Sequence, residues 1–386
     1  MTKVLAVSHA RDVMGTEHSL LNVTSPLSSR GVAMMVAAPA GGSLEERWRE
    51  LGLTFYELEL PERNGFRPNT GQGYNSLSEL ARLPLRSMQA IARITRLVRR
   101  SDADVIHSNS LITHLDCAVV GRITRTRSVL ELHELIAPGI GRLFLGLAVL
   151  LSGKAIAISS AVRDQLPRWA RKHVLVIPQS VDIDRFDGTG APGEWRSRLS
   201  GTPDAPLVAA VGRIDPEKGL HTLVRAVAIL RESGIDLQLA LVGSPSKDSG
   251  AYLAELQELG DRLLGDAMRI VPQVSDVPAV LKSVDVLACP SIAEPFGLIL
   301  LEAQASRVPV VASAAGGPPE FITHGETGML FAPEDVPGLA DALAQLVASP
   351  ALRDQLAMAG QSMVRSNYTA QIRADRFASL YRELAA

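Results

Sequence analysis

The segment from Val284 to Glu320 places the tightest constraint on what this chain can fold into. It contains two short apolar runs, at 284–290 and 308–313, and an almost entirely apolar stretch between them at 296–305. Short apolar runs bounded by loops predict buried strands, and the stretch between them predicts a helix that exposes little surface to water. The segment therefore predicts a strand–helix–strand unit of a buried sheet.

Two glutamates interrupt this apolar unit. Glu302 stands within the predicted helix, where an ionised carboxylate is costly unless a partner binds it. Glu294 precedes the helix, whose free N–H groups attract phosphate, and Gly297 permits a ligand to approach that backbone closely. The spacing alone leaves two interpretations open: a ligand site, or an ordinary unit in which an arginine neutralises Glu302.

The sequence EPFG at 294–297, then Glu302, then PVVAS and GGPPE, resembles the two-glutamate signature of the retaining GT-B glycosyltransferases of family 4. The resemblance implies that Glu294 contacts hydroxyls of a donor sugar and that Glu302 binds the nucleotide ribose. It also implies that the donor diphosphate is held by the backbone of Phe296, Gly297 and Leu298.

A second part of the predicted site lies in the first half of the chain. The loop Met14-Gly15-Thr16-Glu17 follows a strand predicted at 3–8 and resembles the family's Gly-Gly-x-Glu loop, with Met14 in place of the first glycine. The resemblance brings the backbone of Gly15 to the donor, and a plain strand-to-helix turn is the alternative.

Asn109 and His133 follow strands predicted at 104–107 and 129–132, at the sheet edge where open α/β folds bind ligands. A histidine in such a place is structural more often than catalytic. In the resembling family, however, a histidine at this strand end reaches the donor sugar beside the anomeric carbon. His133 is therefore the catalytic residue predicted for this half.

Arg213 and Lys218 flank a turn between a strand predicted at 207–212 and a helix predicted at 220–231. Two cations at such a turn suit a diphosphate, and the resemblance implies that they neutralise the leaving group. A surface ion pair with a neighbouring acid is the alternative. The resemblance also places the nucleotide base against the backbone of Val274, at the end of a strand predicted at 268–274.

Composition excludes several other classes. A net charge of −2 over 386 residues offers no basic field for nucleic acid, and two isolated cysteines, Cys117 and Cys289, indicate neither a disulfide framework nor a cysteine metal site. Asp102-Ala103-Asp104 precedes its strand, so no metal site is predicted there. We expect no cofactor besides the donor.

The cellular setting is expected to be the cytoplasm, because MTKVLAVSHA shows no signal architecture and the apolar run at 143–151 is far below the ~20 residues that span a bilayer. That run is predicted to be a buried helix. Peripheral contact with the inner face of a membrane stays open, since many members of the resembling family act on lipid-linked acceptors, although no clearly basic amphipathic helix indicates it.

Strands alternate with helices through both halves, which predicts an α/β protein of two doubly wound parallel sheets. The resemblance specifies GT-B architecture, with two Rossmann-like domains facing a central cleft. Residues 1–184 are expected to bind the acceptor and residues 185–369 the nucleotide sugar, with a helix at 370–386 packing back on the first domain.

The predicted function is a retaining, metal-independent hexosyl-type glycosyltransferase that moves sugar from a UDP- or GDP-sugar to an unidentified hydroxyl acceptor. Its predicted catalytic residues are His133, Glu294, Arg213 and Lys218. No motif places a carboxylate as a nucleophile, so same-face attack through an oxocarbenium-like state is favoured. A nucleotide-sugar epimerase of the same fold and a non-catalytic nucleotide-binding protein are the alternatives. The oligomeric state is not predicted.

Overall fold

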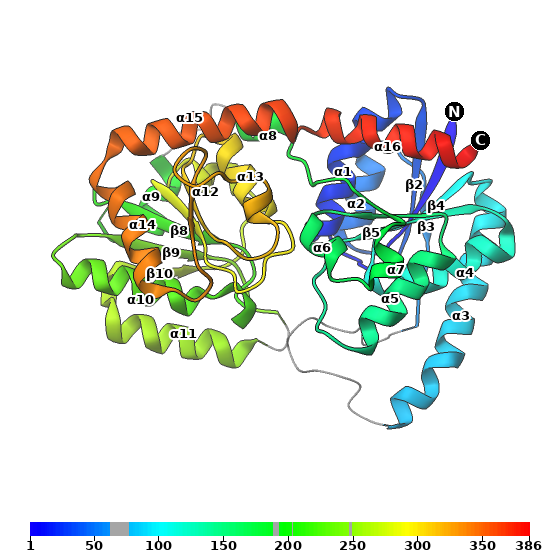
Figure 1. The fold of residues 1–386 in the computed structure, drawn as a ribbon, viewed down its shortest axis with the longest axis horizontal. Helices are drawn as coiled ribbons and strands as arrows, with labels where there is room; N and C mark the ends of the chain where they lie inside the picture. The colour runs from blue at the N-terminus through cyan, green and yellow to red at the C-terminus, as the bar shows by residue number, and fades with distance from the viewer. Residues whose placement is uncertain (62–76, 188–192, 203, 247–248) are drawn as a thin grey trace. The chain divides into compact units, whose positions relative to one another are not determined.

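The computed structural model describes residues 1–61, 77–187, 193–202, 204–246 and 249–386. It divides into two compact units: unit 1 is Met1–Ser180 with Ala370–Ala386, and unit 2 is Val181–Thr369 (Figure 1). The expected boundary at 184/185 is therefore four residues late. Val181 already belongs to unit 2, because it forms a parallel bridge with Thr369 and its N–H donates to the carbonyl of Tyr368.

Within the described ranges, unit 1 is built on a parallel sheet of seven strands in the order β3-β2-β1-β4-β5-β6-β7. The strands are β1 (Thr2–Val7), β2 (Val32–Ala38), β3 (Phe55–Glu57), β4 (Val105–Ser108), β5 (Arg127–Leu132), β6 (Lys154–Ala157) and β7 (Val174–Val176). The helices are α1 (Gly15–Ser28), α2 (Ser43–Glu50), α3 (Leu77–Ser101), α4 (His114–Thr124), α5 (Ile140–Leu151), α6 (Ser160–Asp164), α7 (Arg168–Arg171) and α16 (Ala370–Ala385).

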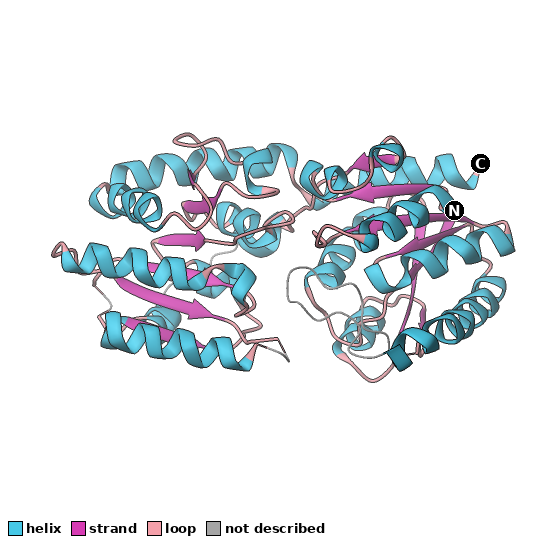
Figure 2. Ribbon diagram, turned by 60° about the horizontal axis from the view of Figure 1, so that its bottom comes forward, coloured by secondary structure: helices cyan, strands magenta, loops and turns pink. Residues whose placement is uncertain are grey.

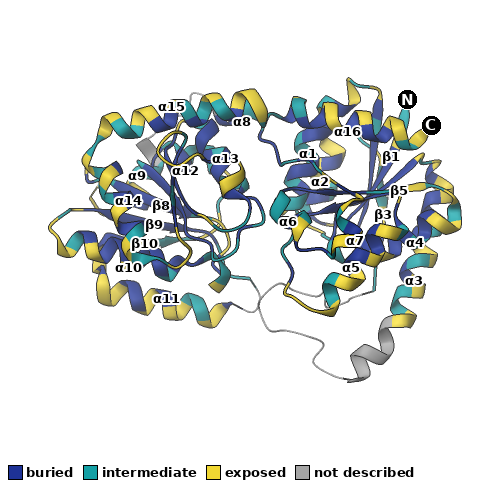
Figure 3. Cartoon of the chain, in the orientation of Figure 1, coloured by how far each residue is buried: buried dark blue, intermediate teal, exposed yellow. Residues whose placement is uncertain are grey.

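Helices cover both faces of this sheet (Figure 2). Alternate side chains of a strand point to opposite faces, and in β1 both sets are buried. Val4 and Ala6 pack in one cluster with Phe377 of α16, whereas Leu5 and Val7 pack in another with residues of α3 and α4. Burial on both faces explains why these strands read as continuous apolar runs, and they are dark blue in Figure 3.

Unit 2 contains, in its described ranges, a parallel sheet of six strands in the order β10-β9-β8-β11-β12-β13. The strands are β8 (Leu207–Val211), β9 (Gln238–Val242), β10 (Met268–Val271), β11 (Val286–Cys289), β12 (Val310–Ser313) and β13 (Met329–Phe331). The helices are α8 (Ile183–Asp187), α9 (Gly193–Leu199), α10 (Leu220–Glu232), α11 (Gly250–Leu263), α12 (Val277–Leu281), α13 (Leu298–Ala305), α14 (Val336–Ala348) and α15 (Pro350–Asn367).

The prediction of two doubly wound α/β sheets is confirmed, and the strand order locates the ligand edge of each. The direction of winding reverses between β1 and β4 in unit 1 and between β8 and β11 in unit 2. Ligands of open parallel sheets bind at the carboxyl ends of the strands at such a reversal. The loops after β1, β4, β8 and β11 are therefore where the fold itself favours a site.

The apolar run at 143–151 forms most of α5, but the prediction that this helix is buried is wrong. Leu145, Ala148 and Val149 face the interior, whereas Leu143 is 53% exposed. In the part of the chain that the structure describes, no helix combines the length and apolarity needed to cross a bilayer. The sequence also predicts an irregular loop at 61–76, rich in proline, glycine and asparagine, and a linker at 187–192. Apart from Pro61, that loop falls outside the described residues, as do 188–192 of the linker.

Candidate functional site

A partly buried ion pair joins the two loops at the reversal point of unit 2. Lys218, in the loop after β8, places its Nζ 2.9 Å from Oε2 of Glu294, in the loop after β11. The hydroxyl of Ser291 donates to the same oxygen at 2.8 Å. The two residues that the sequence assigned separately, to diphosphate and to sugar, are therefore direct neighbours.

Charge, rather than burial, sets the ionisation of this pair. Burial favours the neutral form of each group, but the opposite charge outweighs it: the pKa of Glu294 lies below its ordinary value and the pKa of Lys218 above. Burial also raises the pKa of the neighbouring Cys289 thiol to about 11, so the thiol stays protonated at neutral pH. The pair is thus a carboxylate and an ammonium held together at the ligand edge of the sheet.

The glycine pair at 316–317 is explained by packing against the Glu294 loop. Gly316 has φ +81°, and a Cβ there would lie 2.0 Å from the carbonyl oxygen of Glu294. That carbonyl also accepts a hydrogen bond from the N–H of Gly317 at 2.8 Å. Gly316 is required because any side chain would push the Glu294 backbone away, so the glycine pair of the signature positions the glutamate.

Helix α13 begins at Leu298, two residues later than the apolar pattern predicts. Gly297 precedes it in the left-handed region, at φ +96°, which ends the preceding extended segment and turns the chain into the helix. Leu298 is partly exposed and Phe296 is buried. The backbone expected to hold diphosphate thus forms the first turn of a helix whose leading N–H groups are available to an anion.

Glu302 lies on α13 and, in the described part of the chain, forms no ion pair. It is partly buried, and among the described residues no hydrogen bond or ion pair holds its carboxylate; Arg185 lowers its pKa only in part. Burial therefore dominates and raises the pKa of Glu302 to about 7. The alternative in which an arginine neutralises this glutamate is wrong, and an unpartnered carboxylate in this position is what a ligand with hydroxyl donors would satisfy.

Arg213 forms ion pairs with neighbouring acids, which was the alternative to diphosphate binding that the sequence allowed. Its guanidinium donates to Asp215 and, at 2.8 Å, to Glu217, and its side chain is 48% exposed.

Val274 lies in a loop, because β10 ends at Val271 rather than at 274. Pro272 follows β10 directly and has no N–H to continue the hydrogen bonds between strands.

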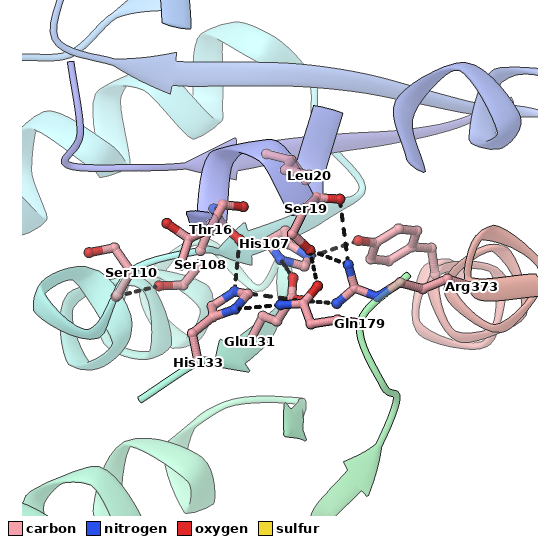
Figure 4. Close-up of polar contacts among 12 residues, drawn as sticks. Thr16, Ser19, Leu20, His107, Ser108, Ser110, Glu131, His133, Gln179 and Arg373 are labelled. Carbon is pink, nitrogen blue, oxygen red and sulfur yellow. Dashed lines mark hydrogen bonds and ion pairs between the residues drawn. The ribbon is translucent and has the colours of Figure 1, made fainter. Parts of the chain in front are cut away.

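In unit 1, His133 is buried and both of its ring nitrogens have protein partners (Figure 4). The side-chain amide of Gln179 lies 3.2 Å from Nδ1, and Oδ1 of Asn109 lies 3.2 Å from Nε2. Burial lowers the pKa of His133, so the ring is neutral near physiological pH. The contacts fit one tautomer, in which Nδ1 accepts from the Gln179 amide and Nε2–H donates to Asn109.

A charged network lies beneath His133. Glu131, on β5, binds Arg373 of α16 through one oxygen and Nε2 of His107 through the other, at 2.9 Å. His107 Nδ1 contacts the hydroxyl of Tyr381 at 2.7 Å. Figure 4 shows these side chains converging from α1, β4, β5 and α16. His133 itself is held by Asn109, by Gln179 and by Glu131, whose Oε1 lies 3.5 Å from His133 Nε2.

Gly15 and Asn109 have different surroundings from those expected. Gly15 opens α1, and a Cβ there would meet no atom within 4 Å, so no left-handed backbone or close contact requires a glycine. Asn109 is fully buried; its amide nitrogen donates to the carbonyl of Thr16 at 3.3 Å. Asn109 thus links the first turn of α1 to His133.

The two carboxylates of the Asp-x-Asp sequence, Asp102 and Asp104, both accept hydrogen bonds from Lys3. Asp102 binds Nζ of Lys3 at 2.8 Å, and Asp104 accepts from the Lys3 backbone N–H at 2.8 Å, so the Asp-x-Asp sequence anchors the start of β1. Within the described ranges, no group of three or more His, Cys, Asp or Glu side chains is arranged to hold a metal ion.

Sequence reasoning missed Glu131, His107, Gln179, Arg373 and Tyr381 of the unit 1 network. Glu131 and Arg373 carry a signal in the sequence. Glu131 is a charge inside the apolar strand VLEL, and Arg373 lies four and eight residues before Phe377 and Tyr381, on the same helix face. A charge in a buried strand and a charge on an apolar helix face predict a buried pair. Gln179 carries no such signal.

Comparisons with known proteins agree with this arrangement. Residues 194–363 match the family model described as glycosyl transferases group 1, and residues 13–185 match glycosyltransferase family 4. A D-inositol 3-phosphate glycosyltransferase of Actinosynnema mirum is 41% identical over 191 residues, which are 48% of this chain and 46% of that protein. An alpha-D-kanosaminyltransferase of Streptomyces kanamyceticus is 30% identical over 245 residues, 61% of this chain and 62% of that protein. The matches thus span less than two thirds of either relative.

Solved structures share the fold over the whole chain. Anabaena HepE in complex with UDP and glucose superposes with a TM-score of 0.83 at 22% identity, covering 99% of this chain and 100% of that one. Sucrose-phosphate synthase from Thermosynechococcus elongatus gives a TM-score of 0.79 at 22% identity, covering 100% and 99%. With family matches in both units and this architecture, the chain belongs to the group 1, family 4 glycosyltransferases.

Proposed function

We propose that this protein is a retaining, metal-independent glycosyltransferase that moves a sugar from a UDP- or GDP-sugar to a hydroxyl acceptor. The observation that carries the proposal is the Lys218–Glu294 pair at the reversal point of unit 2, beside the first turn of α13. An ammonium and helix N–H groups suit a diphosphate, and a carboxylate beside them suits sugar hydroxyls.

Relatives support both nucleotides as donors. A mannosyltransferase of Mycolicibacterium smegmatis, 34% identical over 226 residues, is named as GDP-mannose-dependent. The Anabaena structures contain UDP, UDP-glucose, or UDP and glucose. The residues of unit 2 fit the groups that these donors share, which are the diphosphate, the ribose and a hexose.

In the proposed mechanism, Lys218 and the start of α13 stabilise the charge that develops on the leaving diphosphate. Arg213 contributes less, because Asp215 and Glu217 already bind it. Glu294 accepts hydrogen bonds from the sugar as its ring becomes oxocarbenium-like, and the leaving phosphate takes the acceptor's proton. His133, held neutral by its burial, is expected to contact the donor sugar as a hydrogen-bonding group and not as a cation.

Glu302→Gln is expected to weaken binding of the free nucleoside diphosphate and to remove its pH dependence. The pKa of Glu302 is about 7, and ribose hydroxyls favour the ionised form. Wild-type affinity should therefore fall as the pH drops below about 7, by up to about tenfold per unit. Calorimetry with UDP and GDP on either side of that pH measures the effect.

Glu294→Ala is the matched variant for this experiment, because Glu294 is expected to contact the sugar and not the nucleotide. It should depress kcat while the free nucleoside diphosphate binds nearly as before. Normal, pH-dependent affinity in Glu302→Gln, or lost affinity only in Glu294→Ala, would mean that the two roles are assigned wrongly.

Activity is expected to survive EDTA, because a lysine and a helix N-terminus supply the positive charge that the diphosphate needs. The assay compares donor turnover before and after chelation and after addition of Mg²⁺ or Mn²⁺. Complete loss on chelation with recovery on either metal would contradict metal independence.

A screen of UDP-, GDP- and other sugar nucleotides for slow donor hydrolysis tests the proposed function as a whole, since it needs no acceptor. Release of free sugar and nucleoside diphosphate supports transfer chemistry. Conversion of the donor to an epimeric sugar nucleotide without an acceptor would identify an epimerase, and binding of UDP or GDP without consumption of any donor would identify a non-catalytic protein.

A further inference from the structure

A closed cycle of polar contacts connects His133 to α16 within unit 1 (Figure 4). Arg373 donates from one nitrogen to the hydroxyl of Ser19 and from another to Oε1 of Glu131. The Ser19 hydroxyl donates to Oε1 of Gln179, and Nε2 of Gln179 lies 3.2 Å from Nδ1 of His133. Nε2 of His133 closes the cycle, 3.5 Å from the same Glu131 oxygen. All five side chains are buried, so they satisfy one another rather than water.

The two charged members fix the direction of the hydrogen bonds in this cycle. A guanidinium can only donate hydrogen bonds, and an ionised carboxylate can only accept them. Because Arg373 donates to the Ser19 oxygen, the Ser19 hydrogen points to Gln179, whose amide oxygen accepts it. The NH₂ group of that amide therefore faces Nδ1 of His133, which accepts and carries no hydrogen. The hydrogen of the neutral imidazole is then on Nε2.

The surroundings of His133 Nε2 require the same arrangement independently. Its two neighbours are acceptor oxygens, Oδ1 of Asn109 at 3.2 Å and Oε1 of Glu131 at 3.5 Å. The Asn109 amide is itself oriented, because its nitrogen donates to the carbonyl of Thr16 at 3.3 Å. If the Gln179 amide were turned over, Nδ1 would need the hydrogen and Nε2 would face two oxygens without one. Both sides of the imidazole thus select the neutral Nε2–H tautomer.

We propose that Gln179 is a positioning residue for sugar transfer, which keeps His133 uncharged by occupying Nδ1 with an N–H donor. An imidazole nitrogen that accepts from an amide cannot take a proton without losing that hydrogen bond. Under the proposed function, His133 lies beside a sugar that gains positive charge, and an imidazolium there would oppose that charge. The role in transfer therefore rests on the proposed function, whereas the tautomer rests on the contacts alone.

The tautomer is tested by ¹⁵N NMR of the purified full chain labelled at histidine, without any ligand. The chain has eight histidines, and the signals of His133 are those that His133→Gln removes. In the wild type, Nδ1 of His133 should resonate as an unprotonated nitrogen and Nε2 as a protonated one. Because burial lowers the pKa of His133, neither signal should titrate near neutral pH.

Gln179→Glu replaces the donor at Nδ1 by an acceptor. Nδ1 must then carry a hydrogen, and Nε2 keeps its own because Asn109 and Glu131 still face it, so the pKa of His133 rises and the imidazole becomes a cation. Both nitrogens should resonate as protonated at neutral pH. The kcat should fall at least about tenfold and recover in part as the pH rises above the raised pKa. The charged and titratable groups that act on His133 from the surrounding elements stay the same: Glu17 on α1, His107 on β4, His114 on α4, Glu131 on β5 and Arg373 on α16.

Gln179→Met is the matched variant, because it keeps a side chain of similar length and removes the amide without adding charge. His133 should stay neutral with Nε2 protonated, and the pH profile of kcat should keep its wild-type shape. Gln371→Glu is the control for added charge, since Gln371 is exposed on α16 in the same unit. It should leave both the His133 signals and kcat unchanged.

The wild-type spectrum decides the tautomer even if neither Gln179 variant folds: a protonated Nδ1 at neutral pH would overturn the proposal. Identical pH profiles for Gln179→Glu and Gln179→Met would overturn it as well, because loss of the contact and not charge would then explain both. A protein with the expected signals that consumes no sugar nucleotide would overturn the proposed function while upholding the tautomer that Gln179 sets.

Discussion

Lys218→Ala is expected to lower kcat about 100-fold or more, equivalent to about 2.7 kcal/mol of transition-state stabilisation. The ammonium is the proposed counter-charge of the leaving group and is only 24% exposed, so solvent screens it weakly. Its loss also leaves Glu294 buried without a cation, which raises the pKa of Glu294 and favours its neutral form. Steady-state kinetics with the donor identified in the hydrolysis screen measures the effect.

Arg225→Ala serves as the control for lost positive charge, because Arg225 is an exposed cation on α10 in the same unit. Its kcat should stay within about twofold of the wild type. The double variant Lys218→Ala/Glu294→Ala tests the pairing: strong non-additivity is expected for residues 2.9 Å apart. A folded Lys218→Ala protein with unchanged kcat would show that Lys218 serves only to hold Glu294.

Arg373→Ala is expected to destabilise unit 1 by about 3–5 kcal/mol, because it strands the Glu131 carboxylate in the core. Both side chains of the pair are at most 2% exposed. Urea unfolding followed by Trp48 fluorescence measures the effect. Trp48 is fully buried in unit 1, and replacing Trp169 and Trp195 by phenylalanine makes it the single tryptophan.

Arg30→Ala is the matched control. Arg30 pairs with Asp375, which lies on α16 like Arg373, but this pair is at the surface, with side-chain exposures of 22% for Arg30 and 66% for Asp375. It should cost at most about 1 kcal/mol. Equal destabilisation by the two variants would contradict the buried-pair account, because helix docking alone would then explain both.

The Arg373–Glu131 pair also predicts how the stability of unit 1 depends on acidic pH. Burial opposes ionisation of Glu131, but Arg373, His133 and His107 outweigh it and hold its pKa well below the ordinary value of 4.5. The resulting stability is fully present above pH 4.5, the value in the unfolded chain, and is lost as the pH falls below it. In Arg373→Ala the pKa of Glu131 rises, so part of this acid-dependent loss should disappear.

The fold class followed from the sequence because the central strands of both sheets, such as β1, β8 and β11, are buried on two faces and read as apolar runs. The ends of strands and helices were predicted less accurately where a single residue determines them. Gly297 delays α13 to Leu298, and Pro272 ends the strand before Val274. These ends are set by the positive φ of Gly297 and by the missing N–H of Pro272, and the pattern of apolar residues contains neither piece of information.

The sequence singled out Glu294, Lys218 and Glu302 as candidate site residues, and it did not predict which of these side chains pair. The contact between Lys218 and Glu294 joins residues 76 positions apart and depends on β8 lying next to β11. The partly exposed α5 was misjudged because apolarity predicts burial only when a neighbouring element exists to cover it.

Helix α16 completes the core of unit 1, yet it follows all of unit 2 along the chain. During synthesis, residues 1–180 therefore emerge without Arg373, Phe377 and Tyr381, and the Glu131 carboxylate has no cation to meet it. Unit 2 is continuous from Val181 to Thr369 and needs no later residue. Unit 2 should consequently complete its folding on the ribosome before unit 1, which is the reverse of their order in the sequence. Unit 1 should expose apolar core surface, and bind chaperones, until α16 has left the exit tunnel.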